Sequence, residues 1–367
     1  MINTPTSYLI RVNKFSILSL ITIGILLNIS ASSVEGLNLY NDNFYFIKRH
    51  IVAILIGSLF FNLLRKLELN LIIKFIPIGM FLTTVSLFLL LSYGVVRGGS
   101  RRWVDLGIIN FQPSEISKVI IILFIAHQIS LEHKDESLFK KLLRVFLLPL
   151  LSSFFILIQP DFGSFASIVF IVFLLLLFSK INFFIPFISI LISFIPIYLI
   201  AKAQPYRFER ITTWRNGLCD LGNVEELLDR CFQLNQSRIA ISSGGWIGLG
   251  PGTSRARWGS LPNAYSDFIS SIIGEEYGFI GLSVVIFLYI LLVSSIFLIA
   301  LREKSEQKKL IVIGIGGWIF FQTIINLGGA VGIVPITGIV LPFISYGSSA
   351  MVSILIALGI MYSRVNE

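Results

Sequence analysis

The residues most able to do chemistry in this sequence are charged side chains within or at the edges of long apolar segments. They are Glu115, Lys118, Asp161, Asp267, Glu275 and Glu276. A charge inside a lipid environment is costly, so such residues are functional candidates by default. A carboxylate can accept a proton from a reacting hydroxyl, and an ammonium group can bind an anionic substrate group.

Several of these candidates also have a purely structural interpretation. Glu115 and Lys118 are three residues apart, so they share a helix face and could form an ion pair of small energetic value. Asp161 and Asp267 each come where a predicted helix begins, and aspartate is a favoured N-cap because it accepts backbone N–H bonds and suits the helix dipole. The residues by themselves leave both interpretations open.

The elements that hold these residues are membrane helices, as the composition shows. Of the 367 residues, 55% are hydrophobic and 13% are charged, whereas a soluble domain is roughly half apolar and a quarter charged. Apolar runs of about 20 residues recur along the chain, the length that a helix needs to cross a bilayer. We therefore expect an all-α integral membrane protein that forms a single polytopic domain over residues 1–367.

The apolar windows and the distribution of basic residues predict how the chain crosses the membrane. About ten helices are expected, near residues 15–33, 50–65, 71–93, 113–131, 142–159, 161–179, 182–202, 266–300, 310–331 and 339–362. With both termini cytoplasmic, the short inner loops carry most of the flanking Lys and Arg, as the positive-inside rule requires. The long loop 203–265, between the seventh and eighth helices, is then extracytoplasmic, and the charged candidates lie on the same outer side.

The excess of positive charge has the same explanation. The net charge is +9, but the 29 Lys and Arg residues are scattered through loops and form no patch interleaved with aromatic residues, so no nucleic-acid partner is predicted. We expect the inner (plasma) membrane of a bacterium. The richness in Ile, Phe, Asn and Lys suggests an AT-rich genome, which leaves a plastid or another organellar membrane as an alternative.

Four ordered blocks of residues carry a resemblance to a known family. The blocks contain Gly98–Trp103 with Phe111–Glu115 and Lys118; Gln159–Gly163; Gln236 to Gly250 with Leu261 to Leu282; and Asn326 to Gly347. In these motifs the sequence resembles the SEDS family of shape, elongation, division and sporulation proteins (FtsW/RodA/SpoVE). The glycine-rich run with Trp246 is more similar to the division branch, FtsW, than to the elongation branch. The family usually has a glutamate and a histidine where this chain has Asn263 and Tyr265.

The resemblance implies a peptidoglycan glycosyltransferase that polymerises lipid II on the outer face of the membrane, with Asp267 as the essential residue. Asp267 would be the general base that takes a proton from the acceptor sugar's 4-hydroxyl. The departing pyrophosphate needs cations, and the candidates by type and side are Arg101, Arg102, Lys118, Arg207, Arg210 and Arg238. Glu115 would orient Lys118 or help to hold a divalent cation, Mg²⁺ or Mn²⁺, although no sequence pattern establishes a metal site.

Cysteines, partners and rival functions complete the expectations. Cys219 and Cys231 both fall in the long outer loop, where they could form a disulfide in an oxidising compartment. Besides lipid II and the nascent glycan, the resemblance implies a class B penicillin-binding protein, a transpeptidase, as partner, together with other division proteins. The rival functions are a lipid II flippase and a non-catalytic division scaffold. Charges confined to the outer half favour the enzyme over the flippase, and the intact Asp267 disfavours the scaffold.

Overall fold

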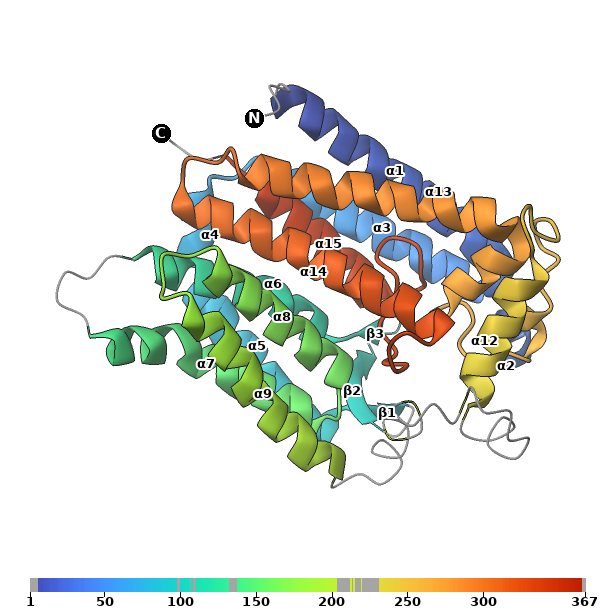
Figure 1. Cartoon of the computed structure of the whole chain (residues 1–367), viewed down its shortest axis with the longest axis horizontal. Helices are drawn as coiled ribbons and strands as arrows, with labels where there is room; N and C mark the ends of the chain where they lie inside the picture. The colour runs from blue at the N-terminus through green and yellow to red at the C-terminus, as the bar shows by residue number, and fades with distance from the viewer. Residues whose placement is uncertain are drawn as a thin grey trace.

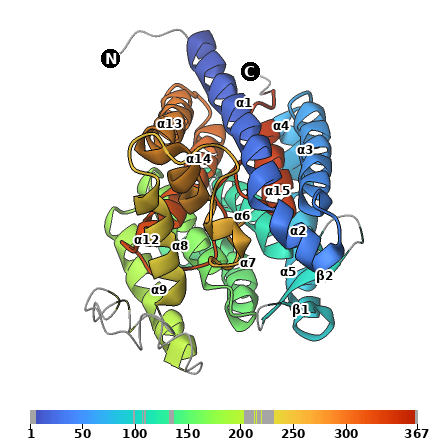
Figure 2. The same ribbon diagram turned by 90° about the vertical axis from the view of Figure 1, so that its right-hand side faces the viewer.

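The protein is a bundle of long helices with a small sheet at one end. The structure, a computed structural model, describes residues 6–97, 100–105, 107, 110–131, 137–202, 212, 214, 219 and 231–364. Both termini lie at one end of the bundle, and the sheet, α2 and α12 lie at the opposite end (Figures 1 and 2). We call this opposite end the sheet end.

Each of the ten predicted helices is present, with ends that differ by a few residues for most of them. They are α1 (Thr6–Ala31), α3 (Tyr45–Leu64), α5 (Ile76–Tyr93), α6 (Pro113–Ser130), α7 (Leu138–Ile158), α8 (Phe162–Leu177), α9 (Phe184–Lys202), α13 (Ile269–Ala300), α14 (Glu306–Val331) and α15 (Ser348–Met361). Within the described residues, six helices are long and apolar enough to span a membrane, namely α1, α3, α5, α7, α13 and α14, and α8, α15 and Phe184–Phe194 of α9 are shorter apolar helices.

The outer faces of these helices are strongly apolar. Leu18 of α1, Phe81 of α5 and Leu191 of α9 each expose about two thirds of their surface, at 66%, 65% and 67%. A water-soluble protein rarely leaves so many large apolar side chains uncovered on its surface. These faces are suited to contact with lipid.

The shorter elements lie in the segments that connect the long helices. They are α2 (Ser33–Tyr40), α4 (Leu69–Lys74), α12 (Phe232–Ser243) and η2 (Ala256–Trp258), with the antiparallel sheet β1 (Val95–Arg97), β2 (Ser100–Asp105) and β3 (Asn110–Phe111) in the order β1-β2-β3. The described part of the predicted loop 203–265 therefore contains helical structure, in α12 and η2.

Helix α6 is the central element of the bundle and carries two of the charged candidates. It packs against α5, α7, α8, α14 and α15, and most of its residues are buried. On α14, a Cβ at Gly314 would lie only 2.8 Å from the Ile122 side chain of α6, so the absence of a side chain there permits the close approach of the two helices. Charges on α6 are therefore held inside the protein and kept away from lipid.

Helix α13 is broken at Gly278, and the glycine-rich run repairs the break. Gly278 has φ 64° and ψ −162°, which is not helical. The backbone groups freed by the break bond to the segment 245–250, through Leu249 N to Glu275 O, Gly250 N to Glu276 O, Phe279 N to Gly245 O and Ile280 N to Trp246 O, at 2.9–3.1 Å. An interrupted helix within the bundle must satisfy its freed backbone groups in some such way.

The last helix begins later than the sequence predicts. We expected it to begin near residue 339, whereas α15 begins at Ser348 and residues 332–347 are largely irregular. Gly338 at φ 72° and Phe343 at φ 67° are in the left-handed region, which a right-handed helix cannot contain. The apolar window was extended by Leu341, Phe343 and Ile344, which are buried in this loop instead of on a helix. We call residues 332–347 the C-terminal loop.

Candidate functional site

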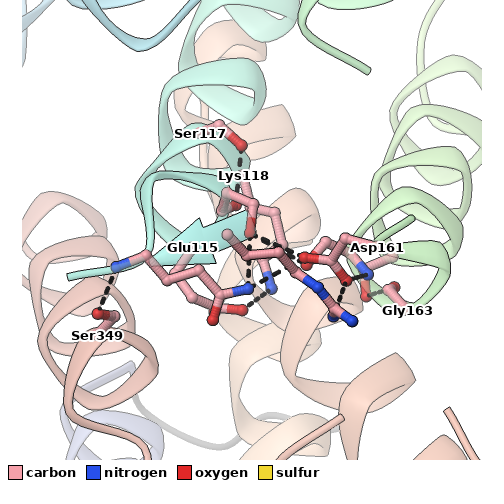
Figure 3. A network of polar contacts seen from close by, with 11 residues as sticks. Glu115, Ser117, Lys118, Asp161, Gly163 and Ser349 are labelled. Carbon is pink, nitrogen blue, oxygen red and sulfur yellow. Dashed lines mark hydrogen bonds and ion pairs between the residues drawn. The ribbon is translucent and has the colours of Figure 1, made fainter. Parts of the chain in front are cut away.

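A buried ion pair lies at the start of α6, at the sheet end. Lys118 Nζ donates to Glu115 Oε1 at 2.7 Å, and the two side chains are only 1% and 8% exposed. The ammonium also lies 5.1 Å from the centre of the Trp318 ring of α14, a favourable cation–π distance. Figure 3 shows the pair between Ser349 on one side and Asp161 on the other. The predicted intrahelical ion pair is present. Because it is buried, removing either partner would destabilise the protein far more than breaking a pair exposed to water.

Asp161 is the centre of a second set of polar contacts next to this pair. Its Oδ1 lies 3.3 Å from Arg102 Nη1, and its Oδ2 accepts hydrogen bonds from Gln112 Nε2 at 3.0 Å and Ser114 Oγ at 3.1 Å. The backbone N–H of Ser164 donates to Oδ1, so Asp161 is also the N-cap of α8.

Ser349 fixes the sheet end of α6 to α15. Its hydroxyl donates to the Asn110 carbonyl at 2.7 Å and accepts from the backbone N–H of Gln112 at 2.8 Å. Strand β3 and the first turn of α6 are thereby held against the start of α15. The charged residues of α6 thus have a fixed position along the bundle relative to the C-terminal loop that precedes α15.

Asp267 lies on the other side of the C-terminal loop and is half-buried. A Cβ built on Gly338 would be 3.5 Å from Asp267 Oδ2. On α14, Asn326 Nδ2 donates to the carbonyls of both Asp267 and Ile339, at 2.8 Å each. Helix α13 begins at Ile269 with Phe268 at its N-cap, so Asp267 lies one residue before the cap.

The C-terminal loop joins the two sets of residues into one site. At Gly163, next to the cap of α8, a Cβ would be 2.7 Å from the Ile339 side chain and 3.4 Å from the Thr337 carbonyl. The adjacent Gly338 faces Asp267. Residues 337–339 therefore pass between Asp161 with Arg102 on one side and Asp267 on the other. Two carboxyl groups and one guanidinium group thus surround one short segment.

Asn263 and Tyr265, the two departures from the family pattern, both fit their places in this chain. Asn263 has φ 58°, where asparagine is tolerated better than most residues, and its carbonyl accepts from the backbone N–H of Asp267 at 3.0 Å. Tyr265 packs its ring 4.6 Å from that of Phe46. Burial first, and then the negative charges of neighbours including Glu35 and Asp267, raise the pKa of Tyr265, so the phenol is neutral and able to donate a hydrogen bond.

The sequence as a whole matches a family model, described as Cell cycle protein (FtsW/RodA/SpoVE), over residues 11–366. The chain belongs to this family. It is 35% identical over 355 residues to a probable peptidoglycan glycosyltransferase FtsW of Wigglesworthia glossinidia brevipalpis, covering 95% of this chain and 91% of the relative. It is 34% identical over 360 residues to Stage V sporulation protein E of Bacillus subtilis, covering 95% of each.

Two solved structures share the fold of this FtsW/RodA/SpoVE chain. A chain of the complex described as "Structural coordination of polymerization and crosslinking by a peptidoglycan synthase complex" superposes with a TM-score of 0.73 at 25% identity, covering 95% of both chains. Rod shape determining protein RodA of Thermus thermophilus superposes with a TM-score of 0.68 at 24% identity, covering 95% of this chain and 93% of that one. The resemblance inferred from the motifs is confirmed, and the chain is a multi-pass membrane protein.

Two more of the predicted site residues of this FtsW/RodA/SpoVE chain bond to helix ends. Arg101 donates to the carbonyls of Leu91 and Ser92 at the end of α5, at 3.3 Å each. Arg238 of α12 donates to the Val331 carbonyl at the end of α14, at 3.0 Å. Arg101 is exposed and Arg238 is half-buried, and both stabilise helix ends, where cations suit the dipole. Arg207 and Arg210 lie outside the described residues.

Glu275 and Glu276 have structural roles in this arrangement. Glu275 accepts from Ser254 Oγ at 2.5 Å and from the backbone N–H groups of Arg255 and Ala256. Glu276 accepts from Ser30 Oγ of α1 at 2.7 Å. These buried carboxylates anchor the segment after the glycine-rich run and α1 to the broken helix α13. Cys219 and Cys231 are joined by a disulfide.

Three residues that complete the site were not predicted as site residues. Gln112, Ser114 and Asn326 belong to the family motifs, but their types suggested no role until their partners were known. Their polarity next to Pro113 and within an apolar α14 was the available signal, because a buried amide or hydroxyl requires a hydrogen-bond partner. In the part of the chain that the structure describes, there is no cluster of three or more His, Cys, Asp or Glu side chains that could hold a metal ion by themselves.

Proposed function

We propose that this chain is a peptidoglycan glycosyltransferase that joins lipid II units with Asp267 as general base. The observation that supports this most directly is the position of Asp267, half-buried at the sheet end and facing Gly338, while Asn326 holds its backbone carbonyl. Relatives that match over 95% and 94% of this chain are named probable peptidoglycan glycosyltransferases.

Asp267 takes the proton of the acceptor 4-hydroxyl as that oxygen attacks the anomeric carbon of the donor sugar. The bond from that carbon to the pyrophosphate oxygen breaks, and the electron pair leaves with the lipid-linked pyrophosphate. A general base must be within hydrogen-bond reach and held in place. Asn326 supplies that placement, since it ties the backbones of Asp267 and Ile339 to one side chain.

Among the residues that the structure describes, Arg102 and Lys118 are the cations best placed to stabilise the leaving pyrophosphate. Arg102 is partly exposed, at 24% of its side chain, and keeps one contact to Asp161. Lys118 is deeper and paired with Glu115. Fixed positive groups aimed at developing negative charge are among the strongest catalytic effects. Arg101 and Arg238 are assigned no such role here, because their guanidinium groups bond to helix ends.

A divalent cation, Mg²⁺ or Mn²⁺, would bind here together with the pyrophosphate of the substrate. Glu115 Oε2 is buried without a hydrogen-bond partner among the described residues, so one protein oxygen is free to contact such an ion. Magnesium is commonly held by one or two carboxylates together with substrate phosphates. Glu115 would hold the ion, which would neutralise part of the leaving-group charge.

Orientation and partners follow from the same proposal. The sheet end faces outward and both termini are cytoplasmic, in the inner membrane of a bacterium. The disulfide between Cys219 and Cys231 supports this, since disulfides persist in oxidising compartments. The similar solved chain belongs to a peptidoglycan synthase complex that coordinates polymerization and crosslinking, which supports a class B penicillin-binding protein as partner, with division as the process.

The alternative of a flippase is disfavoured by the distribution of buried charge. Within the described residues, the buried Asp, Glu and Lys side chains are Glu115, Lys118, Asp161, Glu275 and Glu276. All five lie in the half of the bundle toward the sheet end, so no row of charges leads a charged headgroup across the bilayer.

Two assays on the purified protein in vesicles test the proposal, one for polymer formation from labelled lipid II and one for movement of labelled lipid II between leaflets. Each is run with and without the transpeptidase partner. The glycosyltransferase proposal expects polymer and no accelerated movement. Accelerated movement with no polymer, from folded protein with its partner, would replace the enzyme with a flippase.

A further inference from the structure

An aromatic ledge runs from the functional site to the corner between α2 and α3. It consists of Tyr40, Tyr45, Phe46, Tyr265 and Tyr346. Ring centres along it are 3.6 Å apart for Tyr40 and Tyr45, 5.2 Å for Tyr45 and Phe46, 4.6 Å for Phe46 and Tyr265, and 5.8 Å for Tyr265 and Tyr346. Segments far apart in the sequence therefore contribute to one continuous set of rings.

The outermost ring, Tyr40, is both rigid and accessible. It stacks on Tyr45 at an interplanar angle of 9°, and the Arg49 guanidinium lies 4.5 Å from the centre of the Tyr45 ring. Tyr40 is nevertheless 43% exposed. Tyr45 covers one face of its ring and Phe46 lies edge-on to it at 5.8 Å between ring centres, so a ligand can reach only the remaining part of the ring. A ring held in this way loses little conformational entropy when a ligand packs on it.

The inner end of the ledge reaches the proposed catalytic residue. Tyr265 precedes Asp267 by two residues, and its carbonyl accepts from the backbone N–H of Tyr346 at 3.1 Å. Burial is the main cause that raises the pKa of the Tyr265 hydroxyl, and the negative charges of Glu35 of α2 and Asp267 add to it. The inner end of the ledge therefore has carboxylates near its rings, whereas Phe46, between the two ends, is buried, with 6% of its surface exposed.

A simpler interpretation is that these tyrosines anchor the protein at the membrane interface, where aromatic residues are enriched. Tyr93, at the end of α5, has that character, since it is 84% exposed. The ledge differs in two respects: its rings pack on one another across four segments, and its inner ring, Tyr265, lies two residues before Asp267 in the chain. An anchoring role requires neither feature.

We infer that the aromatic ledge binds pyranose rings of the glycan strand at the site, with the free face of Tyr40 stacked on the apolar C–H face of a sugar. Large aromatic faces supply much contact area, and hydroxyls at their edges can bond to the ligand. A polysaccharide offers alternating apolar faces and hydroxyl rims, which matches this combination. The inference rests on the proposed function, because it assumes that the strand passes Asp267.

The test is direct binding of a soluble oligosaccharide, the β-1,4-linked tetramer of N-acetylglucosamine, to the full-length protein in nanodiscs. Tyr40→Leu should weaken binding roughly two- to tenfold, the range expected for the loss of one aromatic contact. Tyr40→Phe should bind as the native chain does, and Tyr93→Leu is the matched control that should also bind normally. Equal binding by Tyr40→Leu, an equal loss in Tyr93→Leu, or no binding by the native protein would overturn the inference.

The outcome is separable from that of the proposed function, because binding needs no turnover. Asp267→Asn should keep tetramer binding while losing polymerisation. If the tetramer binds through Tyr40 but the native protein forms no polymer, the ledge stands and the glycosyltransferase proposal falls. If polymer forms but Tyr40→Leu binds normally, the reverse holds. Should Tyr40→Leu fail to fold, saturation-transfer NMR on the native protein decides: irradiation of the aromatic protons must reach the sugar, and its absence refutes the ledge.

Discussion

Replacing Lys118 by methionine removes the cation of the buried ion pair while keeping an unbranched side chain of similar length. The Glu115 carboxylate would then be left buried without its 2.7 Å partner, and its other oxygen already lacks one among the described residues. Removing one member of a buried pair typically destabilises a protein by about 3–5 kcal/mol. We expect Lys118→Met to lower the free energy of unfolding by an amount in this range.

A double variant separates charge imbalance from packing. In Glu115→Gln with Lys118→Met no unpaired charge remains, and neutral replacement of both partners of a buried pair is often close to neutral for stability. We expect it to recover most of the lost free energy but to polymerise glycan much more slowly than the native protein, since the pyrophosphate then loses one of its two proposed cations, Lys118, and keeps only Arg102. The assays are unfolding of detergent-solubilised protein and polymer formation from lipid II.

Lys48→Met is the matched control for this experiment. Lys48 pairs with Asp42 at the same 2.7 Å, but its side chain is 65% exposed, and exposed pairs contribute about 1 kcal/mol or less. If Lys118→Met were as mild as Lys48→Met, or if the double variant were as unstable as Lys118→Met, the reasoning about burial would be wrong.

Three further predictions concern the residues that position the site. Asn326→Ala should reduce the polymerisation rate far more than Thr323→Ala one turn earlier, measured at equal folded protein, because only Asn326 holds the Asp267 carbonyl. Gly248→Ala should destabilise the protein strongly, since the new Cβ would lie 2.2 Å from the Glu276 carbonyl. In Gly245→Ala the new Cβ meets no atom within 4 Å, so the free energy of unfolding should fall by only ~1 kcal/mol, the cost of a positive φ. A similar melting temperature for both variants would contradict the described hydrogen bonding of segment 245–250 to the break in α13. Asn263→Gly should leave the melting temperature nearly unchanged, whereas Asn263→Val should lower it, because φ is 58° at this position and a β-branched residue is strained there. Equal melting temperatures for the two variants would show that the backbone is not strained in this way.

The long helices were predictable because their signal is local. An apolar run of about 20 residues determines a membrane helix with little reference to the rest of the chain. The late start of α15 was not predictable in this way, since Leu341, Phe343 and Ile344 are as apolar in a buried loop as in a helix. The break at Gly278 was likewise hidden, because its backbone partners come from residues 245–250.

The candidate site shows the same limit. The types and spacing of Glu115 and Lys118 predicted their contact, since both are on one turn of one helix. Arg101 and Arg102 were indistinguishable in the sequence, yet one bonds to the end of α5 and the other to Asp161. Alternation along strand β2 and the partners across the fold decide this, and neither is visible in the sequence. Asp161 combines its predicted capping role with an ion pair that only the fold supplies.

The most direct test of the central claim is the rate of glycan polymerisation by Asp267→Asn, compared with Glu276→Gln as a control for loss of a nearby carboxylate with a structural contact. Both proteins are assayed as folded chains with the partner, from the same labelled lipid II. We expect the polymerisation rate to fall roughly 10²- to 10⁴-fold in Asp267→Asn, the contribution usual for a general base, and to change much less in Glu276→Gln. A polymerisation rate for Asp267→Asn within about threefold of the native rate would contradict the assignment of Asp267 as the base, since such a loss is far below what a general base contributes.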